Sequence, residues 1–313
     1  MHPAFSVIFF TTASGAGYGL LGLAGILAPL RLIPADRGFA LTILALAFGL
    51  ITAGLLSSAA HLGHPERAWR AFSQWRSSWL SREGILSVAT YIPAAIFGIG
   101  WLFFGRLDGA IAVAGFATAA LAAVTVYCTA MIYASLKPIH AWHNSWVAPV
   151  YAILALMSGA LWLNALTHVW GAGRPWLGVL AAAATIAGLL VKEGYWRFID
   201  TTSGPSTPES ATGLKGKVAL LDGPHTEANY LLREMGYAIA RKHSTKLRQI
   251  ARILGFGLPL ALTLLAPALG GTIAMAATLL AAIAGTLGIL IERWLFFAEA
   301  RHTVTLYYGA TTA

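Results

Sequence analysis

Three polar side chains stand where the second and third long apolar stretches of the chain meet. His61 closes the second stretch, and Arg82 and Glu83 open the third. A carboxylate at the edge of an apolar span is costly unless it is paired, so Glu83 is a candidate functional residue. Histidine can donate a hydrogen bond at neutral pH, and glutamate can relay protons. Such a trio could hold the two carbonyl oxygens of a quinone and supply the protons that its reduction consumes.

The same residues have simpler interpretations. His61 precedes a Gly-containing and Pro-containing turn that would end a helix at the membrane surface. Glu83 could be a first-turn acid that interacts favourably with the helix dipole, with Ser81 as the N-cap. The trio would also suit proton-coupled transport. Residue types and spacing alone leave these alternatives open.

Two further pairs could carry chemistry. His140 and His143 have the three-residue spacing of metal ligands, but no acid or thiolate stands near them to complete a site. Glu292 and Arg293 are neighbours near the end of the last apolar stretch. We expect them to point to different sides and to need different partners.

Histidine and cysteine usage argues against redox groups held by this protein itself. None of the nine histidines falls at the centre of an apolar stretch, whereas a di-haem cytochrome needs facing histidines inside the bilayer. Cys128 is the only cysteine, so neither a disulfide nor a cysteine-ligated iron–sulfur cluster can be built within one molecule. We therefore predict no haem and no metal site, and any cluster must belong to a partner.

The elements that position these residues are built for lipid. Hydrophobic residues make up 58% of the 313 positions and charged residues only 11%, against roughly 25% charged residues in an average soluble domain. A membrane span needs about 20 apolar residues. The stretches that qualify are 5–30, 39–60, 85–104, 110–134, 146–168, 176–198, 251–271 and 273–296. The predicted fold is an all-α integral membrane protein, in which residues 1–313 form one bundle of about eight transmembrane helices.

Basic residues gather in the connections on one side of this bundle. Most of the 21 lysines and arginines lie after the second stretch, after the fourth, after the sixth and in the C-terminal segment. The positive-inside rule then places these connections and both termini in the cytoplasm. Anionic headgroups and membrane insertion explain the net charge of +9. Nucleic acid is therefore not an expected partner.

Two segments on this side are more than simple connections. Residues 61–83 are rich in Trp and Arg, a composition that suits the headgroup layer. Residues 199–250 form a loop whose 227–242 part has the apolar stripe of an amphipathic helix. Such a helix could lie on the bilayer or dock a soluble subunit. In the docking hypothesis, the contact residues are Trp69, Trp75, Tyr230, Met235 and Arg241.

Two runs, HLGHPERAW at residues 61–69 and SWLSRE at 78–83, resemble the membrane-anchor subunits of DMSO-reductase-type molybdoenzymes. Three more are most similar to the branch that serves cytoplasmic sulfite dehydrogenases: MHPAFSVIF at 1–9, SLKPIHAWHN at 135–144 and GPHT at 223–226. The resemblance covers essentially the whole sequence.

This resemblance implies an eight-helix anchor without haem in a bacterial cytoplasmic membrane. The anchor would bind an iron–sulfur subunit and a molybdopterin catalytic subunit on its cytoplasmic face. The resemblance also implies a quinone site at His61 and Glu83, and we expect His64, Arg67 and Arg82 beside it. We expect no independent catalytic activity from this chain alone.

The side on which the partners dock bears on the branch of the family, although it does not fix the direction of electron flow. The anchors of DMSO reductases face the periplasm, whereas the basic loops of this chain point inward. This difference favours the sulfite branch and electron flow into ubiquinone or menaquinone. Two alternatives stay open: an anchor that oxidises quinol for a terminal reductase, and a proton-coupled secondary transporter. The lack of an evident inverted repeat counts against the transporter.

Overall fold

The computed structural model describes residues 4–60, 62–224 and 239–311, and these contain helices and connections but no strand. Eight helices in this part are long and apolar enough to cross a membrane. Seven of them are α1 (Phe5–Leu27), α2 (Arg37–Ala60), α3 (Trp79–Leu102), α4 (Gly109–Ala134), α5 (Val147–Val169), α6 (Pro175–Thr201) and α11 (Gly271–Ala298). The eighth, His243–Leu269, runs through α9 (Ile239–Arg252), η2 (Ile253–Gly257) and α10 (Leu258–Leu269). The predicted class is confirmed, and the protein is a multi-pass membrane protein.

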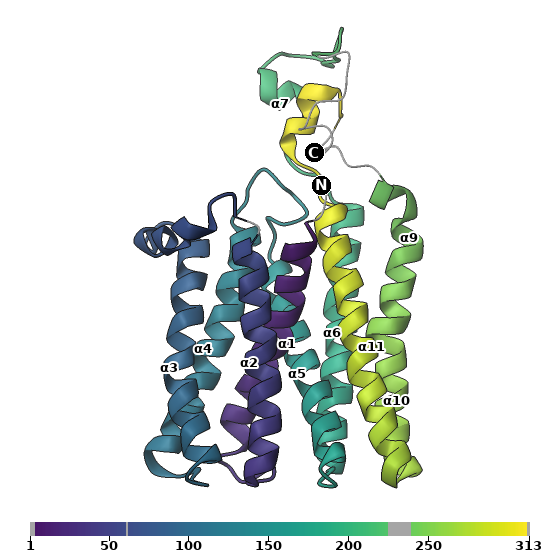
Figure 1. The fold of residues 1–313 in the computed structure, drawn as a ribbon. Helices are drawn as coiled ribbons and strands as arrows, with labels where there is room; N and C mark the ends of the chain where they lie inside the picture. The colour runs from purple at the N-terminus through teal and green to yellow at the C-terminus, as the bar shows by residue number, and fades with distance from the viewer. Residues whose placement is uncertain (1–3, 61, 225–238, 312–313) are drawn as a thin grey trace.

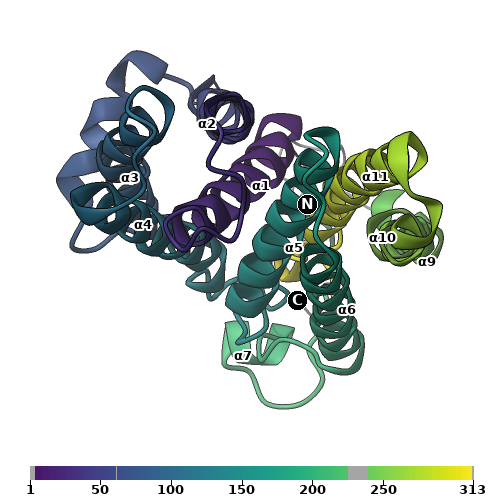
Figure 2. The same ribbon diagram turned by 90° about the horizontal axis from the view of Figure 1, so that it is seen from below.

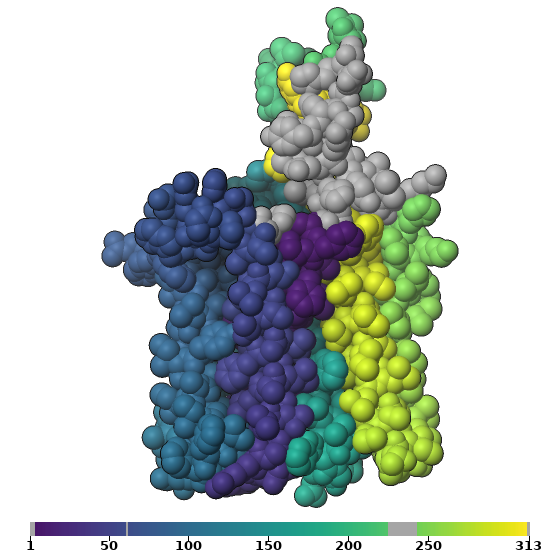
Figure 3. Space-filling view, viewed as in Figure 1, coloured from purple at the N-terminus to yellow at the C-terminus, as the bar shows by residue number. Residues whose placement is uncertain are grey.

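The longer connections gather at one end of the bundle, where both chain ends also lie (Figure 1). We call this end the loop face. It carries η1 (Pro65–Gln74), α7 (Pro208–Thr212) and η3 (Thr303–Tyr308). In the space-filling view, the region of η1 extends sideways beyond the helices, and the region of α7 and η3 rises above them (Figure 3). The opposite end has only short turns. Placement of the loop face in the cytoplasm rests on the charge asymmetry and stays a prediction.

α1 and α5 lie between two groups of helices. Seen along the bundle, α2, α3 and α4 are on one side, and α6, α9, α10 and α11 are on the other (Figure 2). α1 packs against α2, α4, α5 and α11, and α5 packs against α1, α4, α6 and α11. Polar side chains on α1 and α5 can therefore connect the two groups.

Glycines allow the closest contacts between these helices. A Cβ atom added at Gly19 of α1 would overlap the backbone of Ala155 on α5, and one added at Gly159 of α5 would overlap the backbone of Gly19. On the other side of the bundle, a Cβ atom at Gly288 of α11 would overlap the backbone of Gly255 in η2. Small residues at such positions let helix backbones approach in lipid, where packing drives association.

The seventh span differs from its predicted bounds of 251–271. It begins before residue 251 because α9 continues into the membrane through η2, a single π-helical turn. π-Helical geometry occurs mostly as single turns of this kind inside α-helices. Here the turn contains Gly255, which lies against Gly288.

The third span also begins earlier than its predicted bounds of 85–104. α3 starts at Trp79 with Ser78 as its N-cap, and the Ser78 side chain accepts a hydrogen bond from the Ser81 amide at 3.4 Å. The prediction that Ser81 is the N-cap was wrong. Ser78 has the extended backbone typical of an N-cap, which lets its side chain reach the Ser81 amide. The Ser81 hydroxyl donates to the carbonyl oxygen of Ala71 in η1.

Candidate functional site

Glu83 lies near the start of α3 with a side chain that is only 5% exposed. Ser87, one helical turn further on, donates a hydrogen bond to Oε1 of Glu83 at 3.1 Å. The buried Tyr18 of α1 lies next to Ser87 and within electrostatic range of Glu83. No ion pair joins Glu83 to a basic residue in the parts of the chain that the structure describes. It is therefore a buried carboxyl supported by hydroxyl groups.

The other residues predicted to lie beside a quinone are placed differently. His61 falls outside the described residues. His64 and Arg67 have exposed side chains that face Glu66, with His64 Nδ1 3.0 Å from Oε1 of Glu66 and Arg67 Nε 3.7 Å from it. Both lie at the loop face, where α2 ends and α3 begins.

Arg82 holds the η1 region against the start of α3. Its Nε donates to the carbonyl oxygen of Trp75 at 2.9 Å, and its Nη2 donates to that of Arg76 at 2.7 Å. The guanidinium also lies 4.2 Å from the centroid of the Trp79 ring, a cation–π contact. These contacts make Arg82 a positioning residue for the segment above Glu83.

An apolar groove leads from the outside of the bundle to Tyr18. It has a volume of about 190 Å³ and lies between α1, α4 and α5. Its walls are small or aliphatic side chains, and Tyr18 is the only residue in its lining with a polar side-chain group. Because Tyr18 also approaches Ser87 and Glu83, the groove joins the lipid side of the bundle to the buried carboxyl.

A second buried charged group joins α6 to α11. Lys192 Nζ forms an ion pair with Oε1 of Glu292, and Arg293 Nε lies 2.5 Å from Oε2 of the same carboxylate. The exposed fractions of these three side chains are 0%, 0% and 2%. We call these three residues the ionic triad, which contains two cations and one anion.

Aromatic rings surround the ionic triad. Lys192 Nζ lies 3.9 Å from the centroid of the Tyr195 ring, and the guanidinium carbon of Arg293 lies 4.1 Å from that of Tyr151. Cations over aromatic faces are partly compensated by the ring quadrupole. The rings therefore help to hold the unbalanced positive charge of the triad.

The expectation that Glu292 and Arg293 point apart and need different partners was wrong. Adjacent positions on a helix do diverge, but both side chains are long enough to bend toward each other. An uncompensated charge in the apolar interior costs far more than the loss of a preferred direction. Glu292 therefore binds Arg293 as well as Lys192.

A small polar cavity lies beside Arg293. Its volume is about 20 Å³, and α11 contributes Arg293 to its lining. The hydroxyl-bearing residues of the lining come from α1, α4 and α5: Thr11, Thr12, Ser14, Tyr18, Thr129, Tyr151 and Ser158. The Nη1 and Nη2 atoms of Arg293 are buried without a well-formed hydrogen bond. A cavity of more than about 10 to 15 Å³ with several polar partners can hold a water molecule. The cavity connects the ionic triad to Tyr18.

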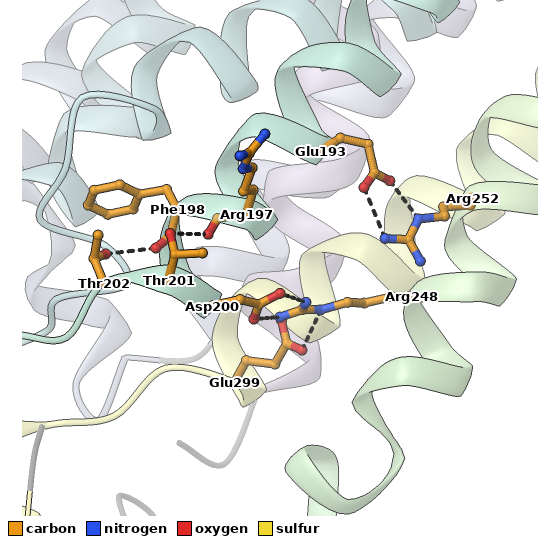
Figure 4. Close-up of polar contacts among 9 residues, drawn as sticks. All are labelled: Glu193, Arg197, Phe198, Asp200, Thr201, Thr202, Arg248, Arg252 and Glu299. Atoms are coloured by element: carbon orange, nitrogen blue, oxygen red, sulfur yellow. Dashed lines mark hydrogen bonds and ion pairs between the residues drawn. The ribbon is translucent and has the colours of Figure 1, made fainter.

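A charged pocket of about 390 Å³ lies at the loop face, beside the end of α6 and the start of α9. Arg248 is one of its lining residues: Nη1 and Nη2 donate to the Asp200 carboxylate at 2.6 and 3.0 Å, and Nε donates to Glu299 at 2.8 Å (Figure 4). Burial raises the pKa of Glu299, although Arg248 opposes the shift. Glu299 is also within electrostatic range of Lys192. The pocket therefore reaches from solvent toward the ionic triad.

The predicted docking residues divide into two groups. Trp69 and Trp75 are exposed at the η1 region, where the guanidinium groups of Arg70 and Arg76 lie over their rings. Tyr230 and Met235 lie outside the described residues, and Arg241 falls in α9, where its side chain is not described. The exposed rings of Trp69 and Trp75 are available to contact either lipid headgroups or a partner subunit.

His140 and His143 do not face one another across a shared site. His140 Nε2 lies 2.9 Å from the Thr202 hydroxyl, and His143 Nδ1 lies 2.6 Å from the carbonyl oxygen of Ala134. Burial and the neighbouring His143 lower the pKa of His140, which favours its neutral form. Both imidazoles therefore make ordinary hydrogen bonds at the loop face.

Lys192 is the functional candidate that the sequence pattern did not single out. Its position within an otherwise apolar span could have marked it as a candidate, because such a charge must find a partner inside the bundle. Its partner could not be read from spacing, since α6 and α11 are far apart in the sequence. Their pairing follows only from the packing of the helices.

Together, the fold and its buried groups define a polytopic helical membrane subunit with a polar interior near one face. Residues 1–298 match the family model of the DMSO reductase anchor subunit (DmsC), and the protein belongs to this family. It is 34% identical over 330 aligned residues to the C subunit of sulfite dehydrogenase from Allochromatium vinosum, with 98% of this sequence and 99% of that protein covered. It is 27% identical over 165 residues to the C subunit of anaerobic dimethyl sulfoxide reductase from Escherichia coli, with 51% of this sequence and 55% of that protein covered. The family resemblance is thus confirmed: the protein is the anchor subunit of a multi-subunit oxidoreductase, and it works with catalytic partner subunits.

Proposed function

We propose that this protein is the quinone-reactive membrane anchor of a sulfite dehydrogenase whose catalytic subunits dock in the cytoplasm. Electrons from sulfite at a molybdopterin subunit pass through the clusters of an iron–sulfur subunit and reduce quinone in the anchor. The near full-length similarity to the C subunit of a sulfite dehydrogenase supports this substrate. Molybdopterin and iron–sulfur clusters belong to the partners, and the anchor itself uses no haem.

The observation that carries the quinone proposal is the meeting of an apolar groove with a buried carboxyl. The groove between α1, α4 and α5 suits an isoprenoid tail that enters from lipid. Tyr18 in the lining of the groove offers a hydroxyl group to a polar ring, and Ser87 and Glu83 lie next to Tyr18. Sites for small ligands combine such apolar walls with a few placed polar groups.

The chemistry assigns distinct tasks to the polar residues. Reduction of one quinone to quinol takes two electrons from a partner's cluster and two protons from water. Glu83 and His61 hold the head group and pass protons to its oxygens, with His64 and Arg67 nearby. Arg82 positions the η1 region, whose Trp69 and Trp75 are available to the iron–sulfur subunit.

The partial similarity to the Escherichia coli reductase subunit favours a second candidate, an anchor that oxidises quinol for a terminal reductase. That reaction runs through the same site in the opposite direction. Two assays on the purified complex distinguish these directions. We expect sulfite to drive the reduction of a quinone analogue, and we expect no reduction of dimethyl sulfoxide by quinol. Membership in an anchor family also favours this class of function over a secondary transporter.

The test compares two electron acceptors in purified complexes. We expect Glu83→Gln and His61→Ala to assemble and to oxidise sulfite with a soluble dye at the wild-type rate, while quinone reduction falls about 100-fold. Glu66→Gln is the matched control, because Glu66 is an exposed acid of the neighbouring η1. Normal quinone reduction in both site variants would remove the proposed site.

A further inference from the structure

The ionic triad can exchange a proton without leaving a bare charge on its carboxylate. With Lys192 protonated, Glu292 has two cationic partners and the triad carries one net positive charge. With Lys192 neutral, Arg293 still pairs with Glu292 and the triad has no net charge. Arginine keeps its proton under all ordinary conditions. Lys192 is therefore the one triad member that can release and regain a proton while every charge stays paired.

A path for protons leads to Lys192 from the loop face. The charged pocket contains Glu299, whose Oε2 atom is buried without a hydrogen-bond partner. Glu299 is also within electrostatic range of Lys192. Its raised pKa, caused by burial, favours the uptake of protons from water at the pocket.

The path continues from the triad toward Glu83. Arg293 of the ionic triad lines the small polar cavity, and Tyr18 lines the same cavity on α1. Tyr18 lies next to Ser87, which donates to Glu83. A water molecule in the cavity would link Arg293 and Tyr18 through hydroxyl groups.

We propose that Lys192 is the proton-exchanging residue of an uptake route that runs from the charged pocket, through the ionic triad and the small cavity, to Glu83. Each proton enters from water at Glu299, occupies Lys192 and passes to the water and hydroxyl groups of the cavity, and from there to the quinone. Arg293 keeps its own proton throughout and only orients the water at the cavity. Two such transfers accompany the two electrons from a partner's cluster, so the reduction is balanced. This inference rests on the proposed quinone site for its end point.

Two substitutions at Lys192 test the route. Lys192→Met preserves the length of the side chain and leaves a neutral Glu292–Arg293 pair. Lys192→Arg preserves the charge but cannot release the proton. We expect both purified complexes to oxidise sulfite with a soluble dye at the wild-type rate and to reduce quinone about 100-fold more slowly. Wild-type quinone reduction by Lys192→Arg would overturn the proposal, since it would show that only the charge is needed.

Rescue by a small weak acid separates proton delivery from structure. We expect millimolar sodium azide, whose neutral acid form can enter buried cavities, to restore much of the quinone reduction by Lys192→Met. A slow variant that azide does not restore would overturn the route, and this measurement decides the matter even where Lys192→Arg does not assemble. Glu193→Gln is the control, because Glu193 is adjacent in α6 but belongs to a half-exposed pair with Arg252. It should keep the wild-type rate.

Failure of this route is distinguishable from failure of the quinone site. If Glu83→Gln abolishes quinone reduction and Lys192→Arg does not, the site stands and the route is wrong. If Glu83→Gln reduces quinone normally, the proposed site is wrong, and the end point of the route is lost with it.

Discussion

Lys192 of α6 and Glu292 of α11 form an ion pair in which neither side chain has any exposed surface. The pair joins helices from distant parts of the sequence, and Arg293 binds the same carboxylate. Removal of one partner of a buried ion pair is costly because it leaves an uncompensated charge in a medium of low polarity. The carboxylate is the one anion for two cations, so the triad depends most on Glu292.

Glu292→Gln should therefore destabilise the protein more than Lys192→Met. We expect a loss of about 3 to 5 kcal/mol for Glu292→Gln, because two buried cations then lose their counterion. The yield of assembled complex and its unfolding temperature in detergent measure the effect. Equal unfolding temperatures for Glu292→Gln and wild type would show that the cations do not need the carboxylate.

The side of the membrane on which the loop face lies can be read with single cysteines. The native Cys128 is buried, whereas Leu221 on the loop face and Arg174 at the opposite end are exposed. We expect a membrane-impermeant maleimide to label Leu221→Cys in inverted vesicles and Arg174→Cys in spheroplasts. The reverse pattern would place the loop face in the periplasm.

Arg82→Ala should loosen the η1 region. The substitution removes two hydrogen bonds to backbone carbonyls and a cation–π contact, a local loss of roughly 1 to 3 kcal/mol. We expect faster trypsin cleavage after Arg67, Arg70 and Arg76 in isolated membranes. Arg82→Lys should recover only part of the protection, because lysine lacks the planar fork that reaches both carbonyls. An unchanged cleavage rate in Arg82→Ala would contradict this positioning role.

Glu299 should make the stability of the protein depend on pH. Burial raises its pKa in the folded state, so the folded protein binds this proton more tightly than the unfolded chain. Ionisation of Glu299 therefore opposes folding above its folded-state pKa, and the cost disappears as the pH falls through that value toward the ordinary glutamate range. We expect Glu299→Gln to raise the unfolding temperature at pH 8 but not at pH 4. A difference of equal size at both values would contradict the raised pKa.

Gly288→Ala should disturb the contact between α11 and η2. The added methyl group would overlap the backbone of Gly255, and overpacking of this kind costs typically about 1 to 3 kcal/mol. Gly49→Ala is the control, because nothing lies within 4 Å of its added Cβ atom. We expect a lower unfolding temperature for Gly288→Ala only. Equal stability of the two variants would show that α11 can shift freely.

Hydropathy alone was enough to predict the eight spans, because the bilayer imposes a minimum length of apolar helix. The same rule misplaced the starts of the third and seventh spans. Helix α3 begins at Trp79, where Ser78 caps it, and the seventh span contains charged residues near the loop face that a hydropathy window rejects. Polar residues that are tied to neighbouring helices can extend a span beyond its apolar part.

The candidate site was predictable only where its members are close in sequence. Glu83 stood out because it opens an apolar span, and the structure buries it. The proximity of Tyr18 to the Glu83 region depends on the packing of α1 against α4 and of α4 against α3, and no local pattern encodes it. The types of Glu292 and Arg293 mark them as candidates, but their pairing is not predictable from helix periodicity, which fixes where side chains start and not how far long ones bend.

The central position of α1 also affects how the protein is made. α1 is synthesised well before α11, yet it carries the buried hydroxyl groups of Thr11, Thr12 and Ser14 and packs against α11. During translation these hydroxyl groups must be satisfied by the backbone of their own helix, as Thr11 and Ser14 are here through bonds to preceding carbonyl oxygens. The contact that closes the polar interior between α1 and α11 can therefore form only after α11 has been synthesised.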